Sequence, residues 1–296
     1  MTNGKRLRLA LLVSGILVVT SAFAREPSVI FAVRDYTHSG ITTSASGQNV
    51  RFLMEPLAYV RNGKPTSLPD SQDQKQFESD YYANRPQYTL YIGGKVSGTA
   101  KVVQPAFEIQ CDSLAAVAQV NPPGLVHGMR MGLASNGDFK ATQYARRAPT
   151  DEERGVALQF ARRIYSKNQV PGFAARRMRL SNLTVFEGAT ESLLIGSFVA
   201  SYPRREADYD LWVTHAAFFV AEKAVDALYK PTLTWFHTGE EASVETQDLV
   251  DILDIDGDGV PEIITQFGYY EAVEYHVYRK AKGKWGDFYK QFGAGC

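Results

Sequence analysis

One short acidic loop near the C-terminus most constrains what this chain can fold into. It lies between two apolar runs, Leu249 to Ile255 and Glu262 to Phe267, whose length and β-branched content favour strands. Aspartates alternate along the loop, and Gly259 stands where a tight backbone turn needs a residue without a β-carbon. The segment therefore predicts a strand, an acidic loop and a second strand.

The loop has the ligand spacing of a calcium site. Calcium takes six to eight oxygen ligands, and a loop supplies them by presenting alternate carboxylates with tight turns between them. Asp254, Asp256 and Asp258 meet that spacing, Val260 can offer its carbonyl oxygen at the seventh position, and Glu262 occupies the ninth. We expect bound Ca²⁺ here, and the alternative is a metal-free hairpin with a tight turn.

The sequence DIDGDGVPEI departs from an EF-hand, because position twelve is Thr265 rather than a bidentate glutamate and the flanks are strand-like. It resembles the calcium loops of FG-GAP and VCBS repeats, the integrin-alpha type. The resemblance implies that Asp254, Asp256, Asp258 and Glu262 are side-chain ligands, although that family usually has aspartate at the ninth position. It covers the loop and its two flanking strands, and it occurs once.

The pattern along the chain predicts an α+β fold weighted toward β, with antiparallel strands and hairpins and one or two helices. We expect no full propeller, because no repeat of fixed period is present. The clearest helix begins at Thr150, with Glu153 completing a capping box, and runs to Tyr165. Ser113 to Val120 is expected to form a short helix, and Arg61 to Asp80 a long surface loop.

Other expected strands are bounded by turn residues, including the Gly93-Gly94 turn of a hairpin. They are Val29–Val33, Val50–Tyr59, Tyr88–Ile92, Lys95–Val103, Leu183–Phe186, Ser192–Ala200, Leu211–Ala221, Thr232–His237, Val273–Arg279 and Trp285–Tyr289.

Residues 1–24 have the layout of a secretory signal peptide: three basic residues, an apolar run from Leu9 to Val19, and the small-residue ending Ala22-Phe-Ala24. An uncleaved anchor is the alternative, but the run is shorter than the roughly 20 residues that a spanning helix needs. We expect cleavage after Ala24, a periplasmic or secreted product, and no membrane span after cleavage. The remainder divides into a β-rich region, 25–110, and an α+β region, 111–296, or forms one domain.

Cys111 and Cys296 are the two cysteines of the chain, and an even number in an oxidising compartment predicts one disulfide between them. The alternatives are two unrelated buried thiols or a reactive Cys111. After removal of the signal, 29 basic and 32 acidic residues remain. This balance argues against a nucleic-acid partner, for which a strongly basic face is expected.

No motif specifies a reaction, since zinc-protease, nucleophile-elbow and phosphate-loop patterns are all missing from the sequence. The favoured function is an extracytoplasmic, non-enzymatic protein in which calcium is structural, with an unknown protein or glycan partner. The alternatives are a calcium-dependent hydrolase of envelope or extracellular polymers and a subunit of an envelope assembly. Two aromatic and acidic groupings would suit a carbohydrate site: Trp235, His237, Glu240 and Glu241, and Tyr269, Tyr270, Glu271 and Glu274.

Overall fold

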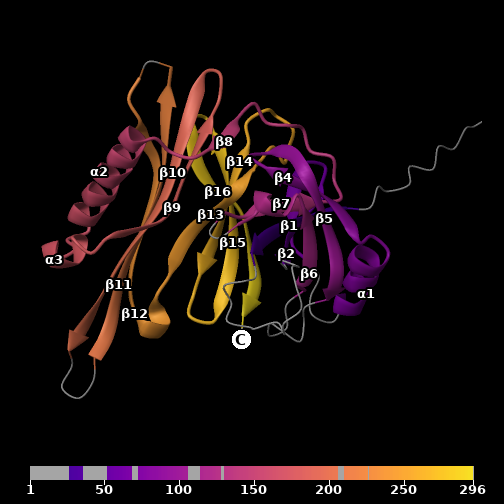
Figure 1. Cartoon of the computed structure of the whole chain (residues 1–296), viewed down its shortest axis with the longest axis horizontal. Helices are drawn as coiled ribbons and strands as arrows, with labels where there is room; N and C mark the ends of the chain where they lie inside the picture. Colours follow the sequence, from indigo (N-terminus) through magenta and orange to yellow (C-terminus); the bar gives the residue numbers. More distant parts are fainter. Residues whose placement is uncertain are drawn as a thin grey trace, which may run out of the picture.

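A computed structural model describes residues 27–35, 52–68, 73–105, 114–127, 130–205, 210–225 and 227–295 (Figure 1). Its strands are β1 (Ser28–Asp35), β2 (Phe52–Arg61), β3 (Lys64–Thr66), β4 (Gln87–Ile92), β5 (Lys95–Pro105), β6 (Ala116–Asn121), β7 (Gly132–Ser135), β8 (Ala145–Arg147), β9 (Arg179–Glu187), β10 (Glu191–Arg205), β11 (Asp210–Ala224), β12 (Lys230–Glu240), β13 (Thr246–Leu253), β14 (Glu262–Gly268), β15 (Ala272–Ala281) and β16 (Lys284–Gly295). Its helices are α1 (Gln74–Glu78), α2 (Asp151–Lys167) and α3 (Gly172–Ala175), with shorter helical turns at Ser79–Ala83, Pro123–Leu125 and Glu241–Ser243.

Six strands close into an antiparallel barrel. Their order is β1-β7-β4-β5-β6-β2, and pairing between β1 and β2 completes the circle, while β3 extends the sheet beyond β2. Strand β1 is bonded along both edges, since Ile30 faces Ala58 of β2 on one side and Ser135 of β7 on the other. Because the sheet is closed, every barrel strand has a hydrogen-bonded neighbour on each side.

Strand β1 is apolar almost without interruption because both of its faces are buried. Successive side chains of a strand point to opposite faces. Val29, Phe31 and Val33 therefore belong to the cluster inside the barrel, whereas Ile30 and Ala32 pack outward against another sheet. Aromatic rings from α1 and the turn after it complete the interior cluster, with the Phe77 and Tyr81 ring centroids 4.8 Å apart.

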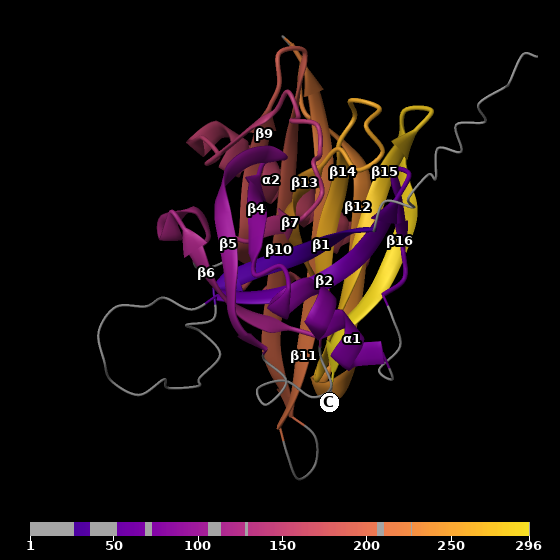
Figure 2. The same cartoon turned by 90° about the vertical axis from the view of Figure 1, so that its right-hand side faces the viewer.

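The barrel is the first of four layers, which Figure 1 shows in sequence from the barrel to α2. The sheet β13-β14-β15-β16 covers the outer face of the barrel strands and shares a hydrophobic cluster with them. Its other face packs against the sheet β12-β11-β10-β9-β8 through a second cluster. Figure 2 shows the barrel strands in front of the long strands of these two sheets. Each sheet thus buries apolar side chains on both faces, which gives the molecule a continuous core.

Helix α2 forms the outermost layer and confirms the prediction made from its capping box. The Thr150 Oγ1 accepts the Glu153 N–H at 3.2 Å, and Glu153 Oε2 accepts the Thr150 N–H at 2.8 Å. The predicted apolar stripe, which includes Phe160 and Tyr165, is buried against β10 and β11. The Gly93-Gly94 hairpin is also confirmed, with both glycines at positive φ.

The prediction of an α+β fold is wrong, because the structure is dominated by a closed barrel and two further antiparallel sheets. The segment expected to be helical, Ser113 to Val120, is replaced in its described part by strand β6 from Ala116, in which Val117 and Val120 are buried. The expected loop 61–80 contains β3 and α1 instead. A run of six apolar residues is too short for its periodicity to distinguish a helix from a strand. The segment that forms β6 is a strand because it pairs with strands that lie elsewhere in the sequence.

The barrel takes strands from both sides of residue 110, since β6 and β7 follow it. The proposed division at that residue stays a prediction. The signal segment 1–24 and both cysteines, Cys111 and Cys296, lie outside the described residues. None of the helices among the described residues combines the length and the apolar character that a membrane-spanning helix requires.

Candidate metal centre

The acidic loop connects β13 to β14 as expected from the sequence. Leu253 pairs with Glu262, so the two strands run directly into the loop, and Asp254 forms an isolated bridge with Lys140. Gly257 and Gly259 have φ values of +78° and +91°, which glycine adopts without steric conflict. These two turns fold the loop back over the ends of the strands.

Three of the predicted ligands come together. Oxygen atoms of Asp254, Asp256 and Glu262 all lie within 4.8 Å of one another. With calcium–oxygen distances of about 2.4 Å, two ligands on opposite sides of one ion are about 4.8 Å apart. The three oxygens can therefore belong to one coordination shell.

Glu262 is the most informative member of this group, because its side chain is fully buried. Its Oε2 accepts the Ile255 N–H at 2.8 Å, but its Oε1 has no hydrogen-bond partner. Burial raises the pKa of Glu262 to about 8, and the nearby charges of Asp256 and Asp254 add to the rise. An unpartnered buried carboxylate oxygen is costly unless a proton or a cation satisfies it.

Asp254 holds the loop backbone and keeps lone pairs for a metal. Its Oδ1 accepts the Gly257 N–H at 2.9 Å and its Oδ2 accepts the Gly259 N–H at 3.0 Å. A carboxylate has about four acceptor positions, so two of them remain. Burial raises the pKa of Asp254, and the charges of Asp258 and Asp256 act in the same direction.

The Asp258 carboxylate is not part of the group of three. The Asp258 side chain is exposed, and its Oδ1 accepts the Val260 N–H at 2.7 Å. In this position Asp258 stabilises the turn of the loop. The assignment of the Asp258 carboxylate and the Val260 carbonyl as ligands therefore stays a prediction.

Two contacts from elsewhere in the chain reach the loop at Asp256. Arg279 of β15 lies with its Nη1 3.5 Å from Asp256 Oδ2, and its guanidinium covers the Phe288 ring at 4.2 Å. Gly63, in the turn between β2 and β3, is so close that an added β-carbon would lie 2.9 Å from the Asp256 Cα. Sequence reasoning missed both residues, because strand pairing and sheet packing alone bring them to the loop.

The two aromatic and acidic groupings lie on different segments, the first on β12 and the turn after it, the second in the β14–β15 turn and on β15. The Trp235 ring stacks on His237 at 6.0 Å and contacts Phe267 edge-on at 5.2 Å. On the second grouping, Tyr269 donates a hydrogen bond of 2.8 Å to Glu274. These contacts place aromatic side chains beside one another, and they define no pair of catalytic carboxylates.

Comparison of the chain with family models, with curated proteins and with solved structures found no match. The interpretation of the site therefore depends on its own geometry and chemistry.

Proposed function

We propose that this is an extracytoplasmic calcium-binding protein with one structural Ca²⁺ in the loop between β13 and β14. Asp254, Asp256 and Glu262 supply carboxylate oxygens. The remaining positions of a six- to eight-coordinate ion fall to Asp258, the Val260 carbonyl or water. The loop's resemblance to FG-GAP and VCBS calcium loops agrees with this proposal.

The observation that carries the proposal is the unpartnered Oε1 of the buried Glu262, beside two further carboxylates. Three negative groups at this separation repel one another, and each suppresses ionisation of its neighbours. Arg279 offers one positive charge, and it contacts only Asp256 among the three. A divalent cation would satisfy the orphan oxygen and neutralise the group at the same time.

The role of the ion is structural in this proposal. The loop joins the edge strand β13 to its neighbour β14 and is packed through Asp256 against Gly63 in the turn between β2 and β3. Calcium would hold the loop in the shape that makes this contact. Extracellular calcium, near 10⁻³ M, would fill a site of the affinity typical for extracellular modules. In this proposal the surface of the folded protein binds a protein or glycan partner.

Calcium titration of the purified protein by isothermal calorimetry tests the proposal. We expect one site with a dissociation constant near 10⁻⁴ M. Glu262→Gln keeps the shape and the acceptor for Ile255 N–H, and it should weaken calcium binding at least about tenfold because a charged ligand is lost. The matched control is Glu271→Gln, an exposed acid in the β14–β15 turn. No calcium binding, or equal binding by the Glu262 variant, would contradict the proposal.

A further inference from the structure

A second polar site lies away from the calcium loop, in a pocket of about 540 Å³ between β8, β9 and the start of α2. This volume falls within the roughly 300–1,000 Å³ of typical small-molecule sites. All four charged residues that line it are arginines, Arg130, Arg146, Arg147 and Arg154, and no acidic residue lines it. A concentration of positive charge in a concave site favours an anionic ligand.

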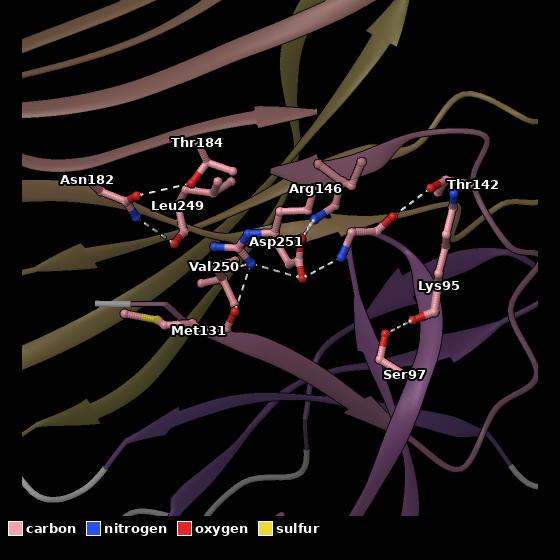
Figure 3. Close-up of polar contacts among 12 residues, drawn as sticks. Lys95, Ser97, Met131, Thr142, Arg146, Asn182, Thr184, Leu249, Val250 and Asp251 are labelled. Carbon is pink, nitrogen blue, oxygen red and sulfur yellow. Dashed lines mark hydrogen bonds and ion pairs between the residues drawn. The ribbon is translucent and has the colours of Figure 1, made fainter. Parts of the chain in front are cut away.

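Two of these arginines are held in fixed positions. The Arg146 side chain is buried, with its Nη1 3.2 Å from Asp251 Oδ2 and hydrogen bonds to the carbonyl oxygens of Met131 and Val250 (Figure 3). Arg147 makes a bidentate contact with Glu153 at 2.8 and 2.9 Å. Their carboxylate partners offset their charges, so these two residues shape the wall of the pocket.

The other two arginines have no such partners. In the part of the chain that the structure describes, the side chains of Arg130 and Arg154 make no hydrogen bond or ion pair. Arg154 is exposed on the first turns of α2, and Arg130 precedes β7. Burial and the neighbouring charge of Arg146 lower the pKa of Arg130, with a smaller opposing effect from Asp251. Two cations thus line the pocket without a direct hydrogen-bonding or ion-pair partner among the described residues.

The chemistry of the lining indicates the ligand class. The guanidinium group presents paired N–H donors that match the oxygens of phosphate, sulfate and carboxylate. Ser181, Asn182 and Thr184 of β9, the strand paired with β8, form another wall of the pocket and add hydroxyl and amide groups. The Ser181 hydroxyl donates a hydrogen bond of 3.1 Å to Asp248. Figure 3 shows Asn182 and Thr184 hydrogen-bonded to each other, which orients this wall.

We propose that the pocket binds the oxyanion group of a small hydroxylated ligand of sugar size, with Arg130 and Arg154 as the principal binding residues. This proposal is independent of the calcium site, which shares none of these lining residues. Arg146 and Arg147 act as positioning residues, since their own carboxylate partners already engage them.

Calorimetry at low ionic strength tests the proposal with five probes: glucose 6-phosphate, glucuronate, glucose, inorganic phosphate and inorganic sulfate. We expect glucose 6-phosphate or glucuronate to bind with a dissociation constant below about 1 mM, and glucose to bind at least tenfold more weakly, because charge-assisted hydrogen bonds dominate. Comparing the affinities for glucose 6-phosphate and glucuronate shows whether the site prefers a phosphate or a carboxylate group. If inorganic phosphate or sulfate binds as tightly as glucose 6-phosphate or glucuronate, the proposal of a sugar-sized ligand is overturned.

Arg154→Ala and Arg130→Ala should each weaken binding of the tighter sugar probe about tenfold or more, the loss expected for one charged hydrogen-bonding partner. Arg162→Ala is the matched control, because Arg162 is an exposed arginine of the same helix outside the pocket. Neither variant removes a contact that holds the fold. Failure of every oxyanion probe to bind, or wild-type binding by both pocket variants, would overturn the proposal.

Discussion

The Asp251 carboxylate lies 3.2 Å from the Arg146 guanidinium, with both side chains buried. The same carboxylate accepts the N–H of Gly93 at 2.9 Å, in the hairpin turn between β4 and β5 (Figure 3). Asp251 belongs to β13, Arg146 to β8 and Gly93 to the barrel. One buried carboxylate therefore joins all three sheets, through an ion pair to β8 and a hydrogen bond from the barrel.

Removing one partner of this pair should destabilise the fold strongly. Asp251→Ala leaves the Arg146 guanidinium buried without its counter-charge, and we expect the free energy of unfolding to fall by about 3–5 kcal/mol. Urea unfolding measures this free energy for the wild type and the variant. Replacing both residues together, with Asp251→Leu and Arg146→Met, should lose less than the single variant. A single-variant loss below about 1 kcal/mol would show that the pair is not desolvated in solution.

Removing calcium should lower the melting temperature. At a calcium concentration ten times the dissociation constant, binding stabilises the folded state by about 1.4 kcal/mol. EDTA should then lower the melting temperature by about 3–6 °C for a protein of this size. Asp256→Ala should melt at the same temperature with and without EDTA. Thermal melts followed by circular dichroism provide the measurement, and an EDTA effect that persists in this variant would place the ion elsewhere.

Arg279 should compete with calcium for Asp256. Its ion pair with Asp256 is partly exposed, so it is worth about 0.2–1 kcal/mol, and its charge also repels the cation. We expect Arg279→Gln to tighten calcium binding about two- to fivefold. Arg279→Lys, which retains the charge, is the control and should bind nearly as the wild type does. Weaker binding by Arg279→Gln would mean that the guanidinium supports the loop.

Glu153 should make stability depend on pH in the acid range. Hydrogen bonds from Arg147 lower the pKa of Glu153 to about 2 from an ordinary value of 4.5. A lowered folded-state pKa gives stability that is present above about pH 4.5 and lost as the pH falls toward 2. Glu153→Gln should lose about 1–3 kcal/mol at pH 7 and much less at pH 3.

Urea unfolding at the two pH values tests this expectation. Glu152→Gln, an exposed neighbour on the same turn of α2, serves as the control and should change stability little at either pH. A Glu153→Gln deficit of equal size at pH 7 and pH 3 would rule out an ionised Glu153 as its source.

Two local patterns predicted the structure correctly, whereas the patterns at 113–120 and 61–80 did not. The capping box at Thr150 and the Gly93-Gly94 turn depend on residues a few positions apart, and both are present. Closure of the barrel could not be predicted in this way. It requires β1 to pair with β7, about a hundred residues later in the chain. The residue pattern of a strand does not indicate which other strand it will pair with.

The same distinction applies to the candidate site. Spacing within the loop predicted that Asp254, Asp256 and Glu262 would lie close together. It could not show that Asp258 points to solvent and bonds the Val260 N–H, which depends on the shape of the turn. The arginines of the pocket are spread over three segments: the residues just before β7, strand β8 and helix α2. The pair Arg146-Arg147 and nearby Arg154 were the one sequence signal that could have drawn attention to them.

The double pairing of β1 has a consequence for the order in which the chain can fold. Synthesis proceeds from the N-terminus, and β1 cannot fill its second edge until β7, ending at Ser135, has emerged. During that interval an apolar strand carries a row of unsatisfied backbone donors and acceptors, the kind of edge at which newly made chains associate. The barrel therefore cannot close before the chain has been synthesised as far as Ser135.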